Sequence, residues 1–357
     1  MNILVFRVGQ LGDMLTALPA FWAVREHFKD ARLTLLSDVQ HGRKFVLAKD
    51  LFAGAGLFDD FMTYTYHRSR LRKALSTAAL LLDLRRRNFN KLVYLYPPER
   101  SVNDVERDRR FFRMAGITSM LGMDAECPLP VRSPNQPLPN SQLEVDMNLA
   151  RLKSSGIPLP APGMGRMDLN LGVPETRELE AWLALQISDG GRRWIGIGPG
   201  SKMPAKVWAE KNFEQCVASL IQRYDFWPVI FGGPEDRLVG ARLIAAWKRG
   251  YCAAGDLSLR ASALGLSRCK LYLGNDTGTM HLAASVKTSC TAIFSARDFP
   301  GRWNPYGVPY RVLRKQIDCE GCLLTECIER RNECLRAIGV DEVLAACEAL
   351  LGGADAP

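Results

Sequence analysis

The stretch LVFRVGQLGDMLTALP, residues 4–19, decides the fold. An apolar run ends in a turn that holds two glycines, Gly9 and Gly12, and Asp13 follows at once. An apolar strand that runs through a glycine turn into a helix is typical of a parallel α/β sheet. The acid is unexpected, because a turn of this kind usually binds phosphate through backbone N–H groups and positive charge.

The turn matches neither of the two common phosphate motifs. It lacks the glycine at position 11 that G-x-G-x-x-G would need, and it lacks the Lys-Ser/Thr ending of a P-loop. Two interpretations of Asp13 remain open at this point. It caps the helix that follows, which is a favoured role for aspartate, or its carboxylate takes part in chemistry.

The alternation of strand and helix continues along the chain and predicts two domains. A Pro/Gly-rich segment over 157–175 reads as a linker. Pro19 predicts a kink or a late start for the first helix. We therefore predict an α/β fold of two Rossmann-like domains, 1–172 and 173–357, whose parallel sheets face a cleft where ligands bind; the last helix can pack back on the first domain. The predicted strands are 2–8, 32–37, 91–96, 194–198, 227–231, 269–273 and 289–294, and the predicted helices 13–28, 209–223, 235–249 and 277–285.

Composition and charge narrow the class of protein. Apolar residues make up 47% and charged residues 24% of the 357, as in a soluble globular protein. Arg7 and Asp13 interrupt the first apolar stretch and no basic leader precedes it, so we expect a cytoplasmic protein. The net charge of +9 favours an anionic partner. Basic residues cluster at 68–73, 85–91 and 100–113, although each cluster also reads as a solvated face.

Nucleic acid is not the expected anionic partner. Phe111 and Phe112, next to Arg109 and Arg110, could stack on bases. However, the sequence carries no nucleic-acid-binding motif, and the core is the favoured place for the two aromatic residues.

Two glycine-containing loops in the second half could hold a diphosphate. In GPGSKMPAKVW, residues 198–208, a strand ends in a turn with Ser201, Lys202 and Lys206. Backbone N–H groups and an ammonium suit a diphosphate, whereas the alternative is a basic surface turn. In LGNDTGTMHLAA, residues 273–284, the N–H groups of Thr277 and Gly278 would point from the start of a helix.

Three further side chains near these loops could bind a sugar or a ribose. Asp276 could accept hydrogen bonds from sugar hydroxyls or could cap the helix. Glu235, after the strand that ends in FGG, could bind ribose hydroxyls or could complement the dipole of its helix. His281 is favoured as a satisfied helix residue.

Taken together, the motifs resemble glycosyltransferase family 9, the family of lipopolysaccharide heptosyltransferases. The resemblance rests on the G-x-x-G-D turn with Leu18-Pro19-Ala20, on PGS…AK-x-W over 199–208 and on GNDTG-x-MHLAA over 274–284. It runs from the first residue to the CLRAI segment that begins at Cys334. The resemblance implies a GT-B fold and inverting, metal-independent transfer, with the acceptor on the N-terminal domain and the nucleotide-sugar donor on the C-terminal one.

The resemblance also implies roles for individual residues. Asp13 matches the catalytic base, Lys206 the lysine on the donor diphosphate, and Asp276, Thr277 and Gly278 the donor-binding turn. The chemistry agrees, because displacement of a nucleoside diphosphate with inversion needs a base for the acceptor hydroxyl and a cationic site for the leaving group. The sequence departs from many heptosyltransferases by having no histidine shortly after the Gly-Asp pair.

The expected reaction is transfer of heptose from ADP-heptose to a lipopolysaccharide core or related glycolipid. It would take place at the cytoplasmic face of the inner membrane, with a monomeric enzyme that needs no cofactor for catalysis. Alternatives are another nucleotide sugar carrying a hexose or hexosamine, a nucleotide-sugar epimerase of the same architecture, and a non-catalytic polyanion-binding protein.

The ten cysteines fall into two groups. Six are scattered and read as buried thiols. The other four are Cys319, Cys322, Cys327 and Cys334. Four close thiols in a cytoplasmic chain favour a metal over disulfides, so a structural zinc or iron–sulfur site is one interpretation. The spacing fits no standard zinc finger, and the other interpretation is a loop with two nearby pairs of reduced thiols.

Overall fold

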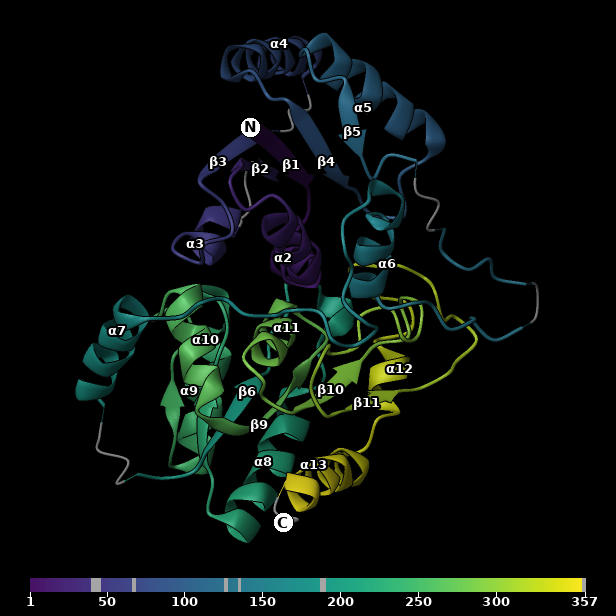
Figure 1. The fold of residues 1–357 in the computed structure, drawn as a ribbon. Coiled ribbons are helices and arrows are strands. Elements are labelled where there is room, and N and C mark those ends of the chain that lie inside the picture. Colours follow the sequence, from purple (N-terminus) through teal and green to yellow (C-terminus); the bar gives the residue numbers. More distant parts are fainter. Residues whose placement is uncertain (40–45, 66–68, 125–127, 134–135, 187–190, 355–357) are drawn as a thin grey trace. The chain divides into compact units, whose positions relative to one another are not determined.

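The computed structural model describes residues 1–39, 46–65, 69–124, 128–133, 136–186 and 191–354. The chain divides into two compact units, which are described one at a time (Figure 1). Unit 1 comprises residues 1–129 and 144–170, and unit 2 comprises 130–143 and 171–357. The passage at 170–171 lies inside the predicted linker. The segment 130–143, which the sequence analysis placed in the first domain, belongs to unit 2.

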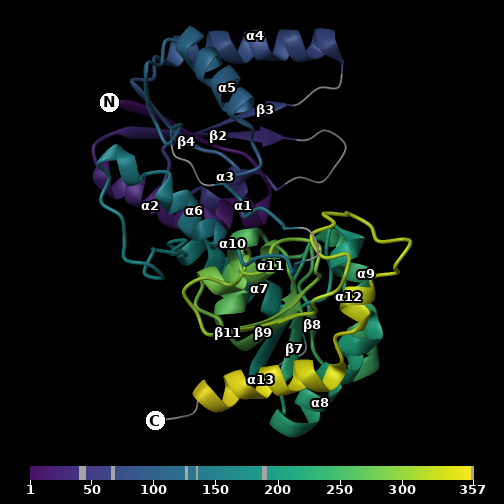
Figure 2. The ribbon, with the colours of Figure 1, turned by 90° about the vertical axis from the view of Figure 1, so that its right-hand side faces the viewer.

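Unit 1 is built on a parallel sheet with the strand order β3-β2-β1-β4-β5. Helices α4 and α5 cover one face of the sheet, and α1 and α2 lie on the other, with α6 beside α2 (Figures 1 and 2). The bounds are β1 Asn2–Arg7, α1 Leu11–Thr16, α2 Leu18–His27, β2 Arg32–Val39, α3 Ala48–Phe52, β3 Asp60–Thr65, α4 Arg70–Arg87, β4 Lys91–Leu95, α5 Val102–Met114, β5 Ser119–Leu121, α6 Glu144–Ala150 and the 3₁₀ turn η1 Lys153–Ser155.

The core under α4 and α5 follows from the alternation of side chains along the strands. Leu4 and Phe6 of β1 and Tyr94 of β4 point to this face and pack with Leu84 of α4 and Phe112 of α5. Phe112 is therefore a core residue. The remaining apolar residues of β1, such as Ile3 and Val5, are also fully buried, as expected for a parallel sheet covered on both faces.

The predicted first helix is two helices. The chain leaves α1 at Thr16 and starts α2 at Leu18, with Ala17 between them. Pro19 occupies the second position of α2, where a backbone N–H would have no partner inside the helix. The expected interruption by Pro19 is thus a restart of the helix.

Unit 2 holds a second parallel sheet, with the strand order β11-β10-β9-β6-β7-β8. Its bounds are α7 Val173–Ala184, β6 Trp194–Gly198, η2 Pro204–Lys206, α8 Glu210–Tyr224, β7 Trp227–Ile230, η3 Pro234–Asp236, α9 Arg237–Trp247, β8 Tyr251–Cys252, α10 Leu259–Ser267, β9 Cys269–Asn275, α11 Gly278–Ser285, β10 Cys290–Phe294, β11 Tyr310–Arg314, α12 Glu333–Arg336 and α13 Val340–Ala354.

The last helix, α13, packs inside unit 2. Val343, Leu344 and Cys347 join the core that Ile195 of β6 and Val217 of α8 form. The expectation that this helix packs back on the first domain is therefore corrected. Its apolar side packs on the sheet and on α8 of its own unit. Burial of that side contributes most of the free energy that stabilises an amphipathic helix in a folded protein.

Each sheet has a point where the direction of strand order reverses. In unit 1 it lies between β1 and β4, and in unit 2 between β6 and β9. Loops at the carboxyl ends of such strand pairs separate, and ligands of open α/β sheets bind there. The loops after β1 and β4, and those after β6 and β9, are therefore the places to look for a site. Within the described residues no helix is long and apolar enough to cross a membrane.

Candidate active site

In unit 1, the loop after β1 is folded tightly around Asp13. Gly9 has a φ of +124°, and a Cβ at this position would lie 2.4 Å from Cγ of Asp13. Only glycine fits both the dihedral angle and the contact. The backbone N–H of Gly9 donates to Oδ1 of Asp38, at the end of β2, over 2.9 Å. Gly12, the second glycine of the motif, lies in the first turn of α1.

The Asp13 carboxylate caps the helix and also reaches the surface. Its Oδ2 accepts the backbone N–H of Gln10 at 2.8 Å, so the capping interpretation is realised. Its Oδ1 lies 3.8 Å from Nη2 of Arg7, and 28% of the side chain is exposed. Capping and chemistry do not exclude each other here, because a carboxylate has two oxygens with several acceptor positions.

Arg7, directly under this carboxylate, is fully buried at the end of β1. Its guanidinium donates to Oδ1 of Asn148 at 3.0 Å and lies 3.3 Å from Oε1 of Glu144. Its Nε donates to the carbonyl of Asp13 at 3.3 Å. A buried charge is tolerated only when it is paired, so α6 fixes the arginine and the arginine fixes the loop. This role of Arg7 was not predicted, and the signal for it was an arginine inside an apolar strand.

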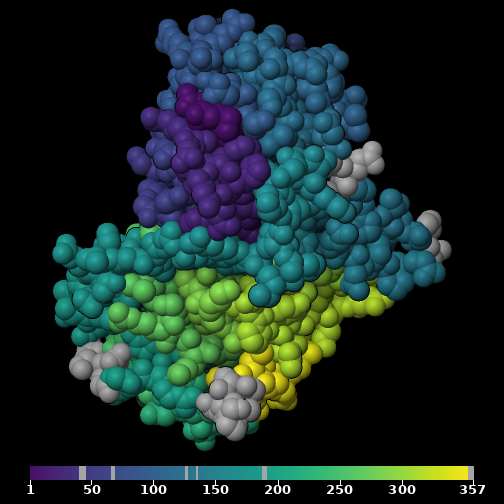
Figure 3. Space-filling view, viewed as in Figure 1, coloured from purple at the N-terminus to yellow at the C-terminus, as the bar shows by residue number. Residues whose placement is uncertain are grey.

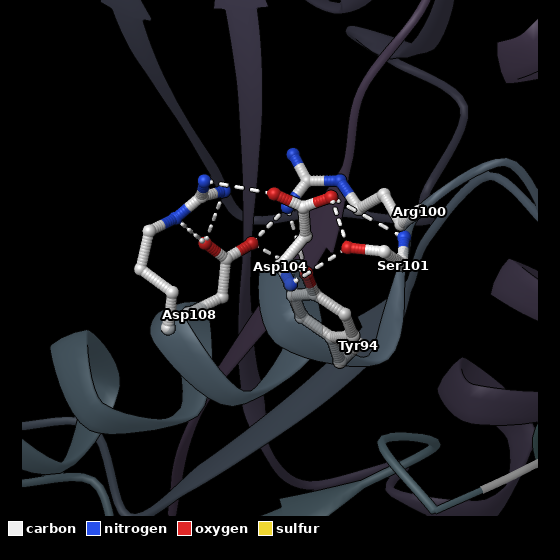
Figure 4. Close-up of polar contacts among 6 residues, drawn as sticks. Tyr94, Arg100, Ser101, Asp104 and Asp108 are labelled. Atoms are coloured by element: carbon white, nitrogen blue, oxygen red, sulfur yellow. Dashed lines mark hydrogen bonds and ion pairs between the residues drawn. The ribbon is translucent and has the colours of Figure 1, made fainter.

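A polar cluster occupies the carboxyl end of β4 and the start of α5 (Figure 4). Arg100 pairs with Asp108 and donates to the Tyr94 hydroxyl at 2.9 Å, and that hydroxyl donates to Asp108 at 2.5 Å. Ser101 caps α5 by accepting the backbone N–H of Asp104. Burial raises the pKa of Tyr94, which stays a neutral donor. The basic stretch 100–113 therefore carries its own acids and is not simply a cationic face.

In unit 2, the two predicted diphosphate loops are held together by Asn275, a fully buried residue at the end of β9. Its Oδ1 accepts the backbone N–H of Trp208 at 3.0 Å, and its Nδ2 donates to the carbonyl of Pro199 at 2.7 Å. The loop after β6 and the turn after β9 are thereby fixed side by side. No role was predicted for Asn275, although it stands in the most distinctive motif.

Lys206 and Asp276 form an ion pair across these two loops. Nζ of Lys206 lies 2.7 Å from Oδ2 of Asp276, and the side chains are 14% and 6% exposed. From the sequence, Lys206 is predicted to bind the diphosphate and Asp276 the sugar. The structure brings the two together, with the ammonium as the more exposed partner.

The turn after β9 leads into α11. Thr277 precedes the helix and its carbonyl accepts the N–H of Met280, while Gly278 is the first helical residue. His281, one turn further, is buried, and burial lowers its pKa to about 4. Its ring lies 6.1 Å from that of Trp303. His281 is therefore a neutral, packed residue next to Asp276 and Lys206, which agrees with the interpretation favoured from the sequence.

The remaining predicted residues lie at the rim of the same loops. Oγ of Ser201 accepts the backbone N–H of Met203 at 3.1 Å, and Lys202 is exposed. Glu235 is also exposed, in η3. Its neighbour Asp236, which the sequence analysis passed over, is the acid that lies between the loops.

Asp236 is packed against two glycines. A Cβ on Gly200 would lie 1.7 Å from Oδ1 of Asp236, and one on Gly232 would lie 2.3 Å from Oδ2. Burial raises the pKa of Asp236 to about 6, although the N–H of Gly233 donates to its carboxylate at 3.0 Å. Glycines at both strand ends are the sequence signal for such a close approach.

The cysteine loop, residues 319–334, follows β11 and contacts the loop after β6. The N–H of Ala205 donates to the carbonyl of Thr325 at 3.0 Å, and Asn332 donates to the carbonyl of Pro204. The pKa of the Cys319 thiol is raised, chiefly by burial and also by the other three thiols nearby. Among the described residues no group of three or more His, Cys, Asp or Glu side chains is arranged to hold a metal ion. The metal site stays a prediction, to be tested by metal analysis of freshly reduced protein.

The scattered cysteines are mostly as expected. Cys216, Cys269, Cys290 and Cys347 are buried free thiols, whereas Cys252 is only partly buried because it lies in the short edge strand β8. The sixth, Cys127, lies outside the described residues.

Comparison with known proteins decides the family. The model of "Glycosyltransferase family 9 (heptosyltransferase)" matches residues 111–332. The chain belongs to this family. It is similar to lipooligosaccharide heptosyltransferase 2 of Campylobacter jejuni, with 20% identity over 98% of both chains. It is 27% identical over 191 residues to lipopolysaccharide heptosyltransferase 2 of Escherichia coli, and that match spans 48% of this chain and about half, 54%, of the relative.

Solved structures of the family share the fold. The family 9 glycosyltransferase of Veillonella parvula superimposes with a TM-score of 0.71 at 18% identity, over 99% of this chain and 97% of that one. The ADP-heptose lipopolysaccharide heptosyltransferase II of E. coli gives a TM-score of 0.69 at 20% identity over the full length of both chains. The predicted α/β architecture of GT-B type is confirmed.

Proposed function

We propose that this chain is an inverting glycosyltransferase that moves heptose from ADP-heptose onto a lipopolysaccharide core or a related glycolipid. The observation that carries the proposal is an ion pair between two side chains in each unit, at the place where the strand order of the sheet reverses. In unit 1 the exposed member is the carboxylate of Asp13, and in unit 2 it is the ammonium of Lys206. These are the two groups that inverting displacement of a diphosphate requires. The names of the relatives support the choice of sugar and acceptor.

In the proposed reaction Asp13 acts as the general base. Its carboxylate takes the proton of an acceptor hydroxyl while the oxygen of that hydroxyl forms a bond to the anomeric carbon. The bond from that carbon to the diphosphate oxygen breaks on the opposite side, and ADP leaves with the electron pair. Arg7 holds the loop so that the carboxylate stays in place. Removal of a general base typically costs a factor of 10² to 10⁴ in rate.

The donor diphosphate is assigned to Lys206, Thr277 and Gly278. The Lys206 ammonium would exchange part of its contact with Asp276 for the phosphate oxygens, and the first N–H groups of α11 would donate to them. Ser201 and Lys202 would extend this site, and Glu235 and Asp276 would face the sugar or ribose hydroxyls. No metal is required in this scheme, because these donors carry the charge of the leaving group.

In this proposal the acceptor binds to unit 1. The enzyme is a monomer and works at the cytoplasmic face of the inner membrane. At the carboxyl end of β4, the partly exposed Arg100 and Asp108 offer a cationic donor and an anionic acceptor, which suits a hydroxyl-rich ligand. The buried Tyr94 hydroxyl bonds to both and holds them in place.

A thermal-shift panel of nucleotide sugars followed by a transfer assay tests the proposal. ADP-heptose should raise the melting temperature and should be consumed only when a glycolipid acceptor is present. Stabilisation by a UDP-sugar but not by ADP-heptose would overturn the donor assignment. Consumption of the donor without any acceptor would instead identify an epimerase.

A further inference from the structure

Helix α4 has two apolar sides, and only one of them is used by the fold. Leu84 is buried in the core of unit 1, and Leu80 and Leu81 pack against that core. The opposite side carries Leu71, Leu75 and Leu82, which are 70%, 64% and 52% exposed. A surface helix normally has one apolar stripe, so the second stripe calls for a partner.

The exposed leucines form a continuous stripe. Positions 71, 75, 78 and 82 follow steps of four, three and four residues, which keeps Leu71, Leu75, Ala78 and Leu82 on one side of an α-helix. Residues 70–75 and 77–79 are all exposed, so this half of α4 stands at the surface. Figure 2 shows α4 and α5 together on one face of the sheet of unit 1, and Figure 3 shows the blue surface that they form.

The leucine stripe is bordered by positive charge. Asp83 is the only acid of α4, and its Oδ1 lies 3.1 Å from Nε of Arg87, with which it forms an ion pair. Arg72 and Arg86 flank the stripe, three and four residues from Leu75 and Leu82, and Arg70 stands at the start of the helix. No carboxylate in the described part of the chain pairs with any of these three arginines. At the end of the helix Arg85 donates to the carbonyl of Met114, a residue of α5 that is itself 54% exposed.

We propose that this side of α4, the leucine stripe with its bordering arginines, docks on a membrane surface that contains anionic lipids. Apolar side chains that enter the boundary of the acyl region, with arginines at the level of the headgroups, are the pattern of an interfacial helix. The overall charge of +9 acts in the same direction. The inference rests on the proposed function for its purpose, because a glycolipid acceptor lies in a membrane.

The charges decide against two other partners. A second copy paired through the same helix would bring arginines against arginines, which is unfavourable at a symmetric interface. Nucleic acid would be bound through the arginines alone, since its phosphate backbone offers no apolar surface for the leucines.

Flotation of the full chain with vesicles tests the inference without donor or acceptor. The vesicles contain phosphatidylglycerol and phosphatidylethanolamine, and phosphatidylcholine vesicles serve for comparison. We expect binding to the anionic vesicles only. The double variant Leu71→Gln/Leu75→Gln should weaken it about tenfold or more, because two leucines leave the acyl boundary while glutamine keeps the helix propensity.

A matched control uses two leucines of similar exposure elsewhere. Leu185 and Leu238 are 84% and 74% exposed in unit 2, so Leu185→Gln/Leu238→Gln should bind vesicles like the unmodified protein. The variant Arg70→Gln/Arg72→Gln/Arg86→Gln should lose about fivefold for each arginine at low salt and less at high salt. Circular dichroism melting checks that all variants fold.

Several results would overturn the inference. If Leu71→Gln/Leu75→Gln and Leu185→Gln/Leu238→Gln floated equally well, the leucines of α4 would not be the membrane contact. If the protein bound phosphatidylcholine vesicles as well as anionic ones, charge would not contribute to binding. A doubled mass in light scattering that Leu71→Gln/Leu75→Gln abolishes would identify a second copy as the partner. Competition by DNA together with insensitivity to the leucine change would identify a nucleic-acid surface. Because the donor is absent, failure of vesicle binding leaves the thermal-shift result untouched, and the two failures are distinguishable.

Discussion

The two ion pairs, Arg7 with Asp13 in unit 1 and Lys206 with Asp276 in unit 2, are built in opposite senses. In unit 1 the cation is fully buried and the carboxylate is 28% exposed, with 3.8 Å between their nearest atoms. In unit 2 the carboxylate is 6% exposed and the cation 14%, with 2.7 Å between them. Both stand where the strand order of a parallel sheet reverses. Each sheet thus presents one sign of charge and uses the other as support.

The difference teaches that a glycine turn between a strand and a helix does not by itself indicate phosphate. In unit 1 the turn wraps the side chain of Asp13, whose oxygen takes up the N–H of Gln10. In unit 2 the corresponding region offers an ammonium and the start of a helix. In each loop the more buried charge, Arg7 in unit 1 and Asp276 in unit 2, supports a more exposed group of the opposite sign.

The largest expected effect is on the unit 1 pair. Asp13→Asn keeps the volume and an oxygen that can accept the Gln10 N–H, so the loop should stay folded. Its amide cannot accept a proton from the acceptor, and kcat should fall by about 10²–10⁴-fold in a steady-state transfer assay. ADP binding, measured by calorimetry, should remain within about twofold. Transfer near the original rate would reduce Asp13 to a helix cap.

The next effect concerns the support in unit 1. Arg7→Met removes the guanidinium that faces the buried Glu144, which should lower the free energy of unfolding by about 3–5 kcal/mol in urea titrations. Adding Glu144→Gln should restore part of the loss, because the buried charge is then removed as well. Arg7→Lys keeps the charge and guards against outright unfolding. A loss below about 1 kcal/mol for Arg7→Met would mean that the pair does not hold the loop.

In unit 2 the exposed cation is the member to remove. Lys206→Met should weaken ADP binding about 10- to 100-fold, as expected for a hydrogen bond between a charged donor and a phosphate oxygen. The exposed Lys202 provides a matched control, and Lys202→Met should change the ADP dissociation constant clearly less. Equal losses in both variants would indicate a general cationic surface in place of a specific contact.

The smallest effect is a pH dependence at Asp236. Its pKa is raised to about 6 in the folded protein, so the folded state binds the proton more tightly than the unfolded one. This contribution to stability is full below the unfolded pKa and is lost as the pH rises toward 6. Asp236→Asn should therefore stabilise the protein at pH 7 by about 1 kcal/mol, allowing for partial solvation, and have little effect at pH 4.

Thermal melting of the unmodified protein and of Asp236→Asn between pH 4 and pH 7 measures the effect of Asp236 on stability. His281, with its lowered pKa, gives a slope of the opposite sign between its folded and unfolded values. The contribution of His281 is the same in both proteins, so it cancels when their melting temperatures are subtracted. A difference that does not change with pH would show that Asp236 is ionised like a surface acid.

Local patterns predicted much of the fold because strands and helices of a parallel sheet leave periodic apolar runs. β6 was predicted at 194–198 with its observed bounds, and the loops after β6 and β9 were recognised from glycines and lysines. What could not be predicted depends on contacts distant in sequence. Glu144 meets Arg7 from 137 residues away, and the basic runs at 68–73 and 85–91 gave no sign that residues 70–87 form one helix. Gly200 and Gly232 signal a close approach, but the sequence does not show that Asp236 is the residue that packs against them.

A single-turnover titration with ADP-heptose tests the division of labour most directly, since it gives both the half-saturating donor concentration and the limiting rate of transfer. The account predicts that Asp13→Asn loses the limiting rate and keeps the half-saturating concentration. For Lys206→Met it predicts that the half-saturating donor concentration rises about tenfold or more, while the limiting rate changes less. If both variants lost the same quantity, or if Asp13→Asn changed donor affinity and left the rate intact, the assignment of base and diphosphate sites would be contradicted.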